Sequence, residues 1–284
     1  MSYFQTTLSG PGYRYVYNNY SGRHLTKVQR GERRERTKDE MEKQNARNRA
    51  IHTQLLILGN FKNGWHMTLT YKKEDRPPDI ESAKKILKNF LARVGRRYKK
   101  AGFEFKWLYV TEIGSHGAIH HHLIIEDIQE GSFSSQRAVR DCWEGGLYFT
   151  PMYEDGEYQA LSEYLVKKES KEKITGCKVT HSRNLIMPKV TRKKKKGFTW
   201  LPEPRVPTGW ELVKDSLHNG INAFTGLPCQ QYLLIESRKG GRDAGKDLCI
   251  HHNKEHPPGG RDGEVRDDDR SKREGSHINW RDKF

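Results

Sequence analysis

The sequence predicts an α+β fold in which a central antiparallel sheet is flanked by helices, and three observations lead to this prediction. Residues 61–73 alternate apolar and polar side chains with the period of two that is typical of a strand. Residues 81–99 carry apolar side chains at helical spacing, opposite a side rich in lysine and arginine. Residues 105–113 and 118–126 are short apolar runs joined by a glycine-containing turn, which indicates a hairpin. Antiparallel strands with helices packed on them describe this order better than a doubly wound sheet.

The remaining elements of this domain have recognisable ends. Residues 38–58 are expected to form a helix that Thr37 caps, with acidic side chains in its first turns. Residues 132–143 predict a helix that begins at a serine cap and stops at two glycines. A short strand at 147–153 and a helix at 157–171 follow.

Changes in composition divide the chain into four regions. Residues 1–59 comprise an N-terminal arm and the first helix, and residues 60–188 form the main domain. Residues 189–237 are a basic segment with a C-terminal extension. Residues 238–284 contain almost no apolar side chains, which predicts a disordered tail.

Two basic or aromatic segments each allow two interpretations. Tyrosines alternate within residues 14–20, which favours either a strand added to the sheet edge or an extended arm that stacks on single-stranded bases. The basic run that ends at Lys196 is either a phosphate-binding flank or a solvated loop. The apolar residues 232–235 can form a last strand.

The overall charge favours a polyanionic partner. The 284 residues include 52 Lys and Arg against 36 Asp and Glu, a formal charge of +16, which indicates nucleic acid before an anionic membrane. No apolar run approaches a membrane-spanning length and the N-terminus lacks a signal-peptide core, so a soluble intracellular protein without a membrane partner is expected. The 4 cysteines are far apart and form no CxxC pair, so free thiols are expected.

Three consecutive histidines form the centre of a candidate metal site. On a strand, His120 and His122 point to one face and His121 to the other. Glu112, across the hairpin, can reach the face of the pair. Two imidazoles and one carboxylate suit a divalent metal with open positions. Idle, solvated histidines are the alternative, but within an apolar strand an unsatisfied imidazole is costly. His116, nearer the turn, is expected to be solvated.

The helix at 157–171 offers two tyrosines as candidate nucleophiles. Tyr158 lies on the apolar stripe and is best interpreted as core. Tyr164 lies at the edge of that stripe, with Lys167 and Lys168 three and four residues further on. A nearby ammonium favours the phenolate and can stabilise a phosphorus centre under attack. Taken alone, this Tyr-x-x-Lys pattern is commonplace on helices.

In chain order, the strand MTLTY, the hairpin with Glu and His-x-His, and the helix with Tyr-x-x-Lys resemble the three motifs of HUH endonucleases. The resemblance is in particular to rolling-circle replication initiators of bacterial plasmids, phages and integrative elements. It runs from about Asn60 to Pro188 and includes NF…WHMTLTYKKEDRPP, DCWEGG and SRNLIMPK. The chain departs from the family at His121, where an apolar or aromatic residue is usual. The six-residue gap between Tyr158 and Tyr164 resembles single-tyrosine members.

The resemblance implies an HUH/RRM-like palm and a metal-dependent enzyme that nicks and joins single-stranded or hairpin origin DNA at a specific site. It implies that Tyr164 attacks, leaving a 5′-phosphotyrosine and a free 3′-OH. Either Lys167 or Lys168 would stabilise the developing charge, and the family pattern favours Lys167. The implied ligands of Mg²⁺ or Mn²⁺ are Glu112, His120 and His122.

The implied setting is the bacterial cytoplasm, with a host polymerase and a host helicase, because no GxxxxGK[ST] segment is present. Two alternatives share the fold: a catalytically silent DNA-binding protein, and an HUH relaxase or transposase. A zinc hydrolase that does not act on DNA gives no reason for the charge of +16.

Overall fold

The computed structural model describes residues 2–20, 35, 37–61, 63–114, 117–152, 157–167, 178–197, 199–222 and 225–237. The predicted disordered tail at 238–284 lies outside these residues. Within the described parts of the chain, no helix is both long and apolar enough to cross a membrane. The α+β class with antiparallel sheets is confirmed.

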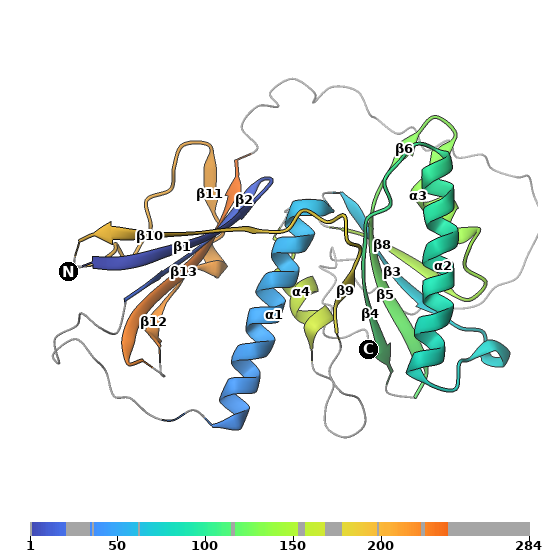
Figure 1. The fold of residues 1–284 in the computed structure, drawn as a ribbon, viewed down its shortest axis with the longest axis horizontal. Helices are drawn as coiled ribbons and strands as arrows, with labels where there is room; N and C mark the ends of the chain where they lie inside the picture. The colour runs from blue at the N-terminus through green and yellow to red at the C-terminus, as the bar shows by residue number, and fades with distance from the viewer. Residues whose placement is uncertain are drawn as a thin grey trace, which may run out of the picture.

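The elements form four layers (Figure 1). A six-stranded sheet lies at one end of the molecule, followed by two helices, then a five-stranded sheet, and then two further helices on its far face. The helices are α1 (Lys38–Asn60) and α4 (Gln159–Val166) between the sheets, and α2 (Ile80–Lys100) and α3 (Ser135–Arg140) outside.

The five-stranded sheet contains the predicted hairpin at its centre. Its spatial order is β8 (Leu147–Pro151), β3 (Gly64–Thr70), β5 (Ile119–Glu126), β4 (Trp107–Ile113) and β9 (Thr180–His181). All four pairings are antiparallel. In the hairpin, Glu112 lies directly opposite His120, and Val110 lies opposite His122. A small separate ribbon pairs β6 (Gln129–Glu130) with β7 (Phe133–Ser134).

α2 covers the far face of this sheet because its sequence is amphipathic. The Asp79 carboxylate caps the helix by accepting the backbone N–H of Ser82 at 2.7 Å. Its buried stripe includes Leu87 and Val94, which pack in one cluster with Leu123 of β5. The opposite side of α2 carries the exposed lysines and arginines that its sequence predicts.

α1 is shared between the two sheets. It begins with the predicted cap: the Thr37 hydroxyl accepts the N–H of Glu40 at 3.2 Å, and the Glu40 carboxylate accepts the N–H of Thr37 at 3.1 Å. Its apolar residues 55–58 are buried. They cluster with Ile124 of the five-stranded sheet and with Leu233 of the six-stranded sheet, so one core joins both sheets.

The two glycines that end α3's segment allow β3 and β8 to approach each other. The backbone N–H of Thr70 donates to the carbonyl of Gly146 at 2.9 Å, and the Trp143 indole donates to the carbonyl of Thr70 at 3.0 Å. A Cβ at Gly145 would overlap that same carbonyl. Only glycine therefore fits at this position.

The six-stranded sheet joins the two ends of the described chain. Its spatial order is β10 (Lys189–Lys196), β1 (Ser2–Gly10), β2 (Tyr13–Asn19), β13 (Leu227–Glu236) and β11 (Trp210–Leu212), with β12 (His218–Asn222) also paired to β13. A short 3₁₀ turn at Lys214–Ser216 joins β11 to β12, and another at Lys73–Asp75 follows β3.

Two expectations for these terminal regions need correction. Residues 2–19 are neither an extended arm nor an edge strand of the five-stranded sheet, but a hairpin inside a second sheet. The basic run 189–196 is neither a loop nor an irregular flank, because β10 pairs with β1 along its whole length. In both cases the pairing partner lies at the other end of the chain, where local sequence patterns give no sign of it. The predicted last strand at 232–235 is confirmed as part of β13.

Candidate metal and nucleophile site

The predicted metal ligands converge on the face of the five-stranded sheet that α1 and α4 cover. Glu112 of β4 pairs with His120 of β5, and His122 follows two residues later on the same face. One donor atom from each residue lies within 4.8 Å of the other two. The Glu112 carboxylate oxygen Oε2 is 3.6 Å from Nε2 of each imidazole.

Burial and charge make this cluster suited to a cation. The side chains of Glu112 and His122 are 5% and 0% exposed. Burial alone would raise the pKa of Glu112, but the two imidazoles that face it outweigh this and lower its pKa to about 2. Glu112 is therefore ionised near neutral pH. A buried carboxylate with two imidazole nitrogens fits a divalent metal that retains open positions.

Neighbouring acceptors hold both imidazoles with Nε2 directed at the cluster. Nδ1 of His120 lies 3.4 Å from the carbonyl oxygen of Ala118, and Nδ1 of His122 lies 3.2 Å from Nε2 of His66. With the proton on Nδ1, each ring donates to these partners and offers the Nε2 lone pair to an ion. Such supporting contacts fix the tautomer and orientation of a ligating histidine.

His66 is the site residue that sequence reasoning missed. It lies on β3, is 2% exposed, and stacks on His122 with ring centres 5.3 Å apart. Burial, followed by the neighbouring His122, lowers the pKa of His66 to about 3, so the ring is neutral and can accept a hydrogen bond. The alternation of WHMTLT carried a signal, because it puts His66 on the same face as Thr68, which pairs with His122.

The predicted nucleophile lies against this cluster. The hydroxyl of Tyr164, on α4, is 3.1 Å from Nε2 of His122, and the two ring centres are 5.1 Å apart. The side chain is half-buried. The lone pair of Nε2 can serve either the Tyr164 hydroxyl hydrogen or an ion, but not both at once.

Tyr158 is a core residue, as predicted. It is 5% exposed and belongs to the cluster that α1 and α4 share. It caps the N-terminus of α4 with a left-handed backbone, φ 49°. The two tyrosines of this segment thus have different surroundings, and Tyr164 is the one whose hydroxyl contacts a candidate ligand.

His121 points away from the cluster, as the strand period predicts. Its Nε2 lies 2.6 Å from the Tyr71 hydroxyl and its Nδ1 lies 2.8 Å from the Thr111 hydroxyl. Both ring nitrogens are thus engaged on the far face of the sheet. His116 lies outside the described residues.

The lysines have a different setting from the one that a longer helix predicts. α4 ends at Val166, and Lys167 is an exposed residue with an extended backbone, φ −51° and ψ 120°. Lys168 lies outside the described residues. Lys167 borders a pocket of about 350 Å³ between α1, α4 and the six-stranded sheet.

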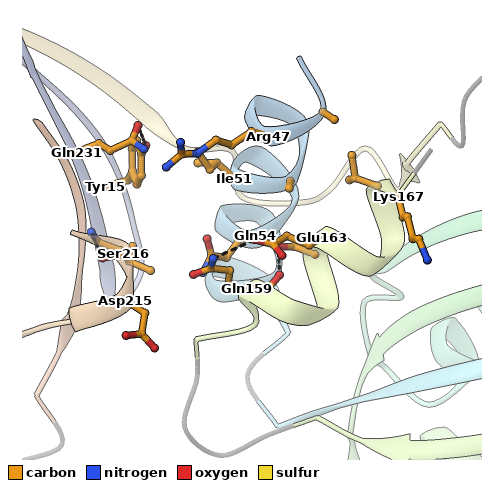
Figure 2. Close-up of a pocket in the computed structure, with 15 residues that line it drawn as sticks. Tyr15, Arg47, Ile51, Gln54, Gln159, Glu163, Lys167, Asp215, Ser216 and Gln231 are labelled. Atoms are coloured by element: carbon orange, nitrogen blue, oxygen red, sulfur yellow. Dashed lines mark hydrogen bonds between the residues drawn. The ribbon is translucent and has the colours of Figure 1, made fainter. Parts of the chain in front are cut away.

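Figure 2 shows this pocket, which contains none of the candidate metal ligands. Arg47 of α1 points across it toward Tyr15 and Gln231, which are joined by a hydrogen bond of 2.9 Å. Lys167 lies at the opposite edge, with its ammonium on the side away from these residues. The pocket is therefore a separate feature from the cluster around Glu112.

The geometry described above lies within the part of the chain that one known family resembles. Residues 64–173 match a family model of replication-associated proteins, the ORF2 type. The matched segment begins with β3 and continues past α4, so it contains the three candidate ligands, Tyr164 and His66. It also contains Lys167 and Lys168, whereas the six-stranded sheet lies outside it. No curated protein and no solved structure matches the chain.

Proposed function

We propose that this protein initiates rolling-circle replication by nicking and rejoining single-stranded origin DNA through a 5′-phosphotyrosine intermediate. One observation carries the proposal: the Tyr164 hydroxyl is 3.1 Å from Nε2 of His122, within a buried Glu-His-His cluster. The match of this segment to a replication-associated family supports the same activity. The protein's charge of +16 supports a DNA substrate.

The reaction exchanges one phosphate ester for another. The Tyr164 oxygen attacks the scissile phosphorus, a tyrosine–phosphorus bond forms, and the bond from phosphorus to the 3′ oxygen breaks. The departing 3′ oxygen takes up the proton that the tyrosine loses, which leaves a 3′-OH for a polymerase. Attack by a 3′-OH on the phosphotyrosine reverses these steps. No external energy source is needed, because the number of ester bonds does not change.

Each residue has a defined part in this scheme. A divalent ion held by Glu112, His120 and His122 would polarise the scissile phosphate and stabilise its developing charge. α4 positions Tyr164 beside that phosphate. Either Lys167 or Lys168, which follow the tyrosine closely in the chain, would supply further positive charge. The silent DNA-binding alternative gives no role to the close approach of Tyr164 to His122.

The proposal is tested by covalent capture. Wild-type protein is mixed with labelled single-stranded DNA carrying candidate origin sequences, in Mn²⁺ or in EDTA, and resolved under denaturing conditions. A DNA–protein band that needs the metal supports a nicking enzyme. DNA binding without any such band, on a pool of random sequences as well, would support the catalytically silent alternative.

His66 is expected to act on the metal through His122, as a positioning residue. Replacing His66 with leucine removes the acceptor for the His122 Nδ1–H, so Mn²⁺ affinity should fall by about 10- to 100-fold. The affinity is measured by titration calorimetry without DNA. His66→Gln keeps an acceptor oxygen and should recover much of the affinity. NMR of the His122 ring nitrogens should show the Nδ1–H tautomer in wild type and a mixture in the leucine variant. Unchanged tautomer and affinity would contradict this role.

Tyr158→Phe is expected to change stability and leave cleavage intact. Tyr158 is buried in the shared core, and the substitution keeps its ring, so the loss should be about 0.5–1.5 kcal/mol, the usual worth of one hydrogen bond. Thermal unfolding measures the first effect and covalent capture the second. Loss of capture in a folded Tyr158→Phe protein would reverse the assignment of the two tyrosines.

A further inference from the structure

The strand β10 is unusually cationic. Six of its eight residues, in the sequence KVTRKKKK, are lysine or arginine. Five of these six side chains are exposed, and Lys195 is half-buried. β10 lies outside the segment that matches the replication-associated family, so that match assigns it no role.

The surroundings of β10 leave its charge uncompensated by neighbouring strands. Among the strands that the structure describes, β10 pairs with β1 alone and forms an edge, and neither β1 nor β2 contains an aspartate or glutamate. Successive side chains alternate between the two faces of the sheet. Lys194 and Lys196 therefore lie on one face of the edge, and Lys193 and Lys195 lie on the other.

Two bland roles account for only part of this charge. The guanidinium of Arg192 lies 4.2 Å from the centre of the Phe4 ring and contributes to packing. Lysines on an edge strand also discourage pairing with other molecules. One or two charges suffice for that purpose, whereas here four consecutive lysines, residues 193–196, follow the arginine. A continuous row of this kind suits a polyanion backbone.

The chain holds β10 in a fixed position relative to the candidate active site. β9 pairs with β4, the strand that carries Glu112, and residues 182–188 lead from β9 to β10. Asn60 at the end of α1 ties this connection down through two hydrogen bonds with the backbone of Ile186, at 3.0 and 2.7 Å. From there β10 extends away from the five-stranded sheet, along the edge of the second sheet (Figure 1).

We propose that β10 is a second DNA-binding site, which binds the phosphates of the strand that flanks the cleavage site. The inference rests on the proposed function for its substrate, since it takes DNA to be the polyanion. Lysines bind phosphates as point charges, so this contact is independent of base sequence and weakens with salt. It would hold the DNA near the nick while the active site selects the cleaved phosphate.

The test compares two proteins that lose equal charge. In one, Lys193, Lys194, Lys195 and Lys196 are replaced by glutamine. In the matched control, four exposed lysines of α2, on the far side of the five-stranded sheet, are replaced by glutamine: Lys85, Lys88, Lys99 and Lys100. Binding of a labelled single strand of about 30 nucleotides, long enough to cover several such sites, is followed by fluorescence anisotropy in EDTA. The salt concentration is varied from about 50 to 200 mM.

The β10 variant is expected to bind on the order of 100-fold more weakly, and its slope of log affinity against log salt should fall by about 3 for four lost phosphate contacts. The α2 variant should bind nearly as wild type does. Equal losses in both proteins would overturn the proposal in favour of a general charge effect. Unchanged binding with lower solubility of the β10 variant would overturn it in favour of edge protection.

Two further measurements keep the result interpretable. If the fourfold variant fails to fold, the pairs Lys193→Gln with Lys195→Gln and Lys194→Gln with Lys196→Gln remove charge from one face at a time, and at least one pair should lose affinity. Covalent capture on a short strand that covers only the nick should be retained by the β10 variant. If wild type gives no capture but the β10 variant still loses affinity, the proposed nicking fails while the second binding site stands.

Discussion

Tyr164→Phe is expected to abolish covalent capture of single-stranded DNA and to leave DNA affinity within about twofold of wild type. The substitution removes only the hydroxyl that would attack phosphorus, and no other group within the Glu-His-His cluster can form a stable ester with DNA under these conditions. The ring keeps its packing beside α1 and its edge contact with His122. Capture is measured by denaturing electrophoresis in Mn²⁺, and affinity by anisotropy in EDTA.

The same variant should bind metal more tightly without DNA. In the wild-type protein the Tyr164 hydroxyl lies 3.1 Å from Nε2 of His122, the nitrogen that an ion requires. Breaking a hydrogen bond worth about 0.5–1.5 kcal/mol would cost the ion about 2- to 10-fold in affinity, and phenylalanine removes that cost. Tyr158→Phe serves as the control, since its affinity for Mn²⁺ should not change. Retained capture in Tyr164→Phe would exclude Tyr164 as the nucleophile.

The double substitution of His120 and His122 by alanine is expected to remove metal-dependent cleavage altogether. It deletes two of the three donors that lie within 4.8 Å of one another, and one carboxylate alone binds Mn²⁺ only weakly. Calorimetry should show no saturable binding of Mn²⁺ at micromolar protein concentrations. Nicking that persists in the double variant would show that the metal, if needed, is held elsewhere.

His121 supplies the matched control for this experiment. It belongs to the same triplet, yet its ring nitrogens contact Tyr71 and Thr111 on the far face of the sheet. His121→Gln should lower the free energy of unfolding by about 1–3 kcal/mol, because buried hydrogen bonds are disturbed. Mn²⁺ binding and capture should be retained at temperatures where the variant is folded. Loss of Mn²⁺ binding in folded His121→Gln would mean that the strand register does not define the ligands.

The sequence was sufficient where structure follows from local periodicity. The period of two separated His121 from its neighbours and put Glu112 beside the pair, because the hairpin that joins them is short. Helical spacing likewise distinguished buried Tyr158 from half-buried Tyr164. These predictions needed only neighbours within one hairpin or one helix.

Other features escaped because they depend on partners far along the chain. His66 joins the site only because β3 pairs with β5, a register that no local pattern fixes. β1 pairs with β10, where Ser2 lies opposite Lys196, so neither segment alone identifies its sheet. The end of α4 at Val166 was also missed, since Lys167 and the residues that follow it are mostly good helix formers.

The six-stranded sheet has a consequence for how the protein is made. β1 and β2 leave the ribosome first, but their outer partners β10 and β13 are translated only after the whole five-stranded sheet. Until then the N-terminal hairpin exposes two unpaired edges and the apolar face that later covers α1. The five-stranded sheet with α2 can assemble earlier, whereas closure around α1 must wait. Release of the C-terminal strands from the ribosome is therefore the step at which both sheets become one structure.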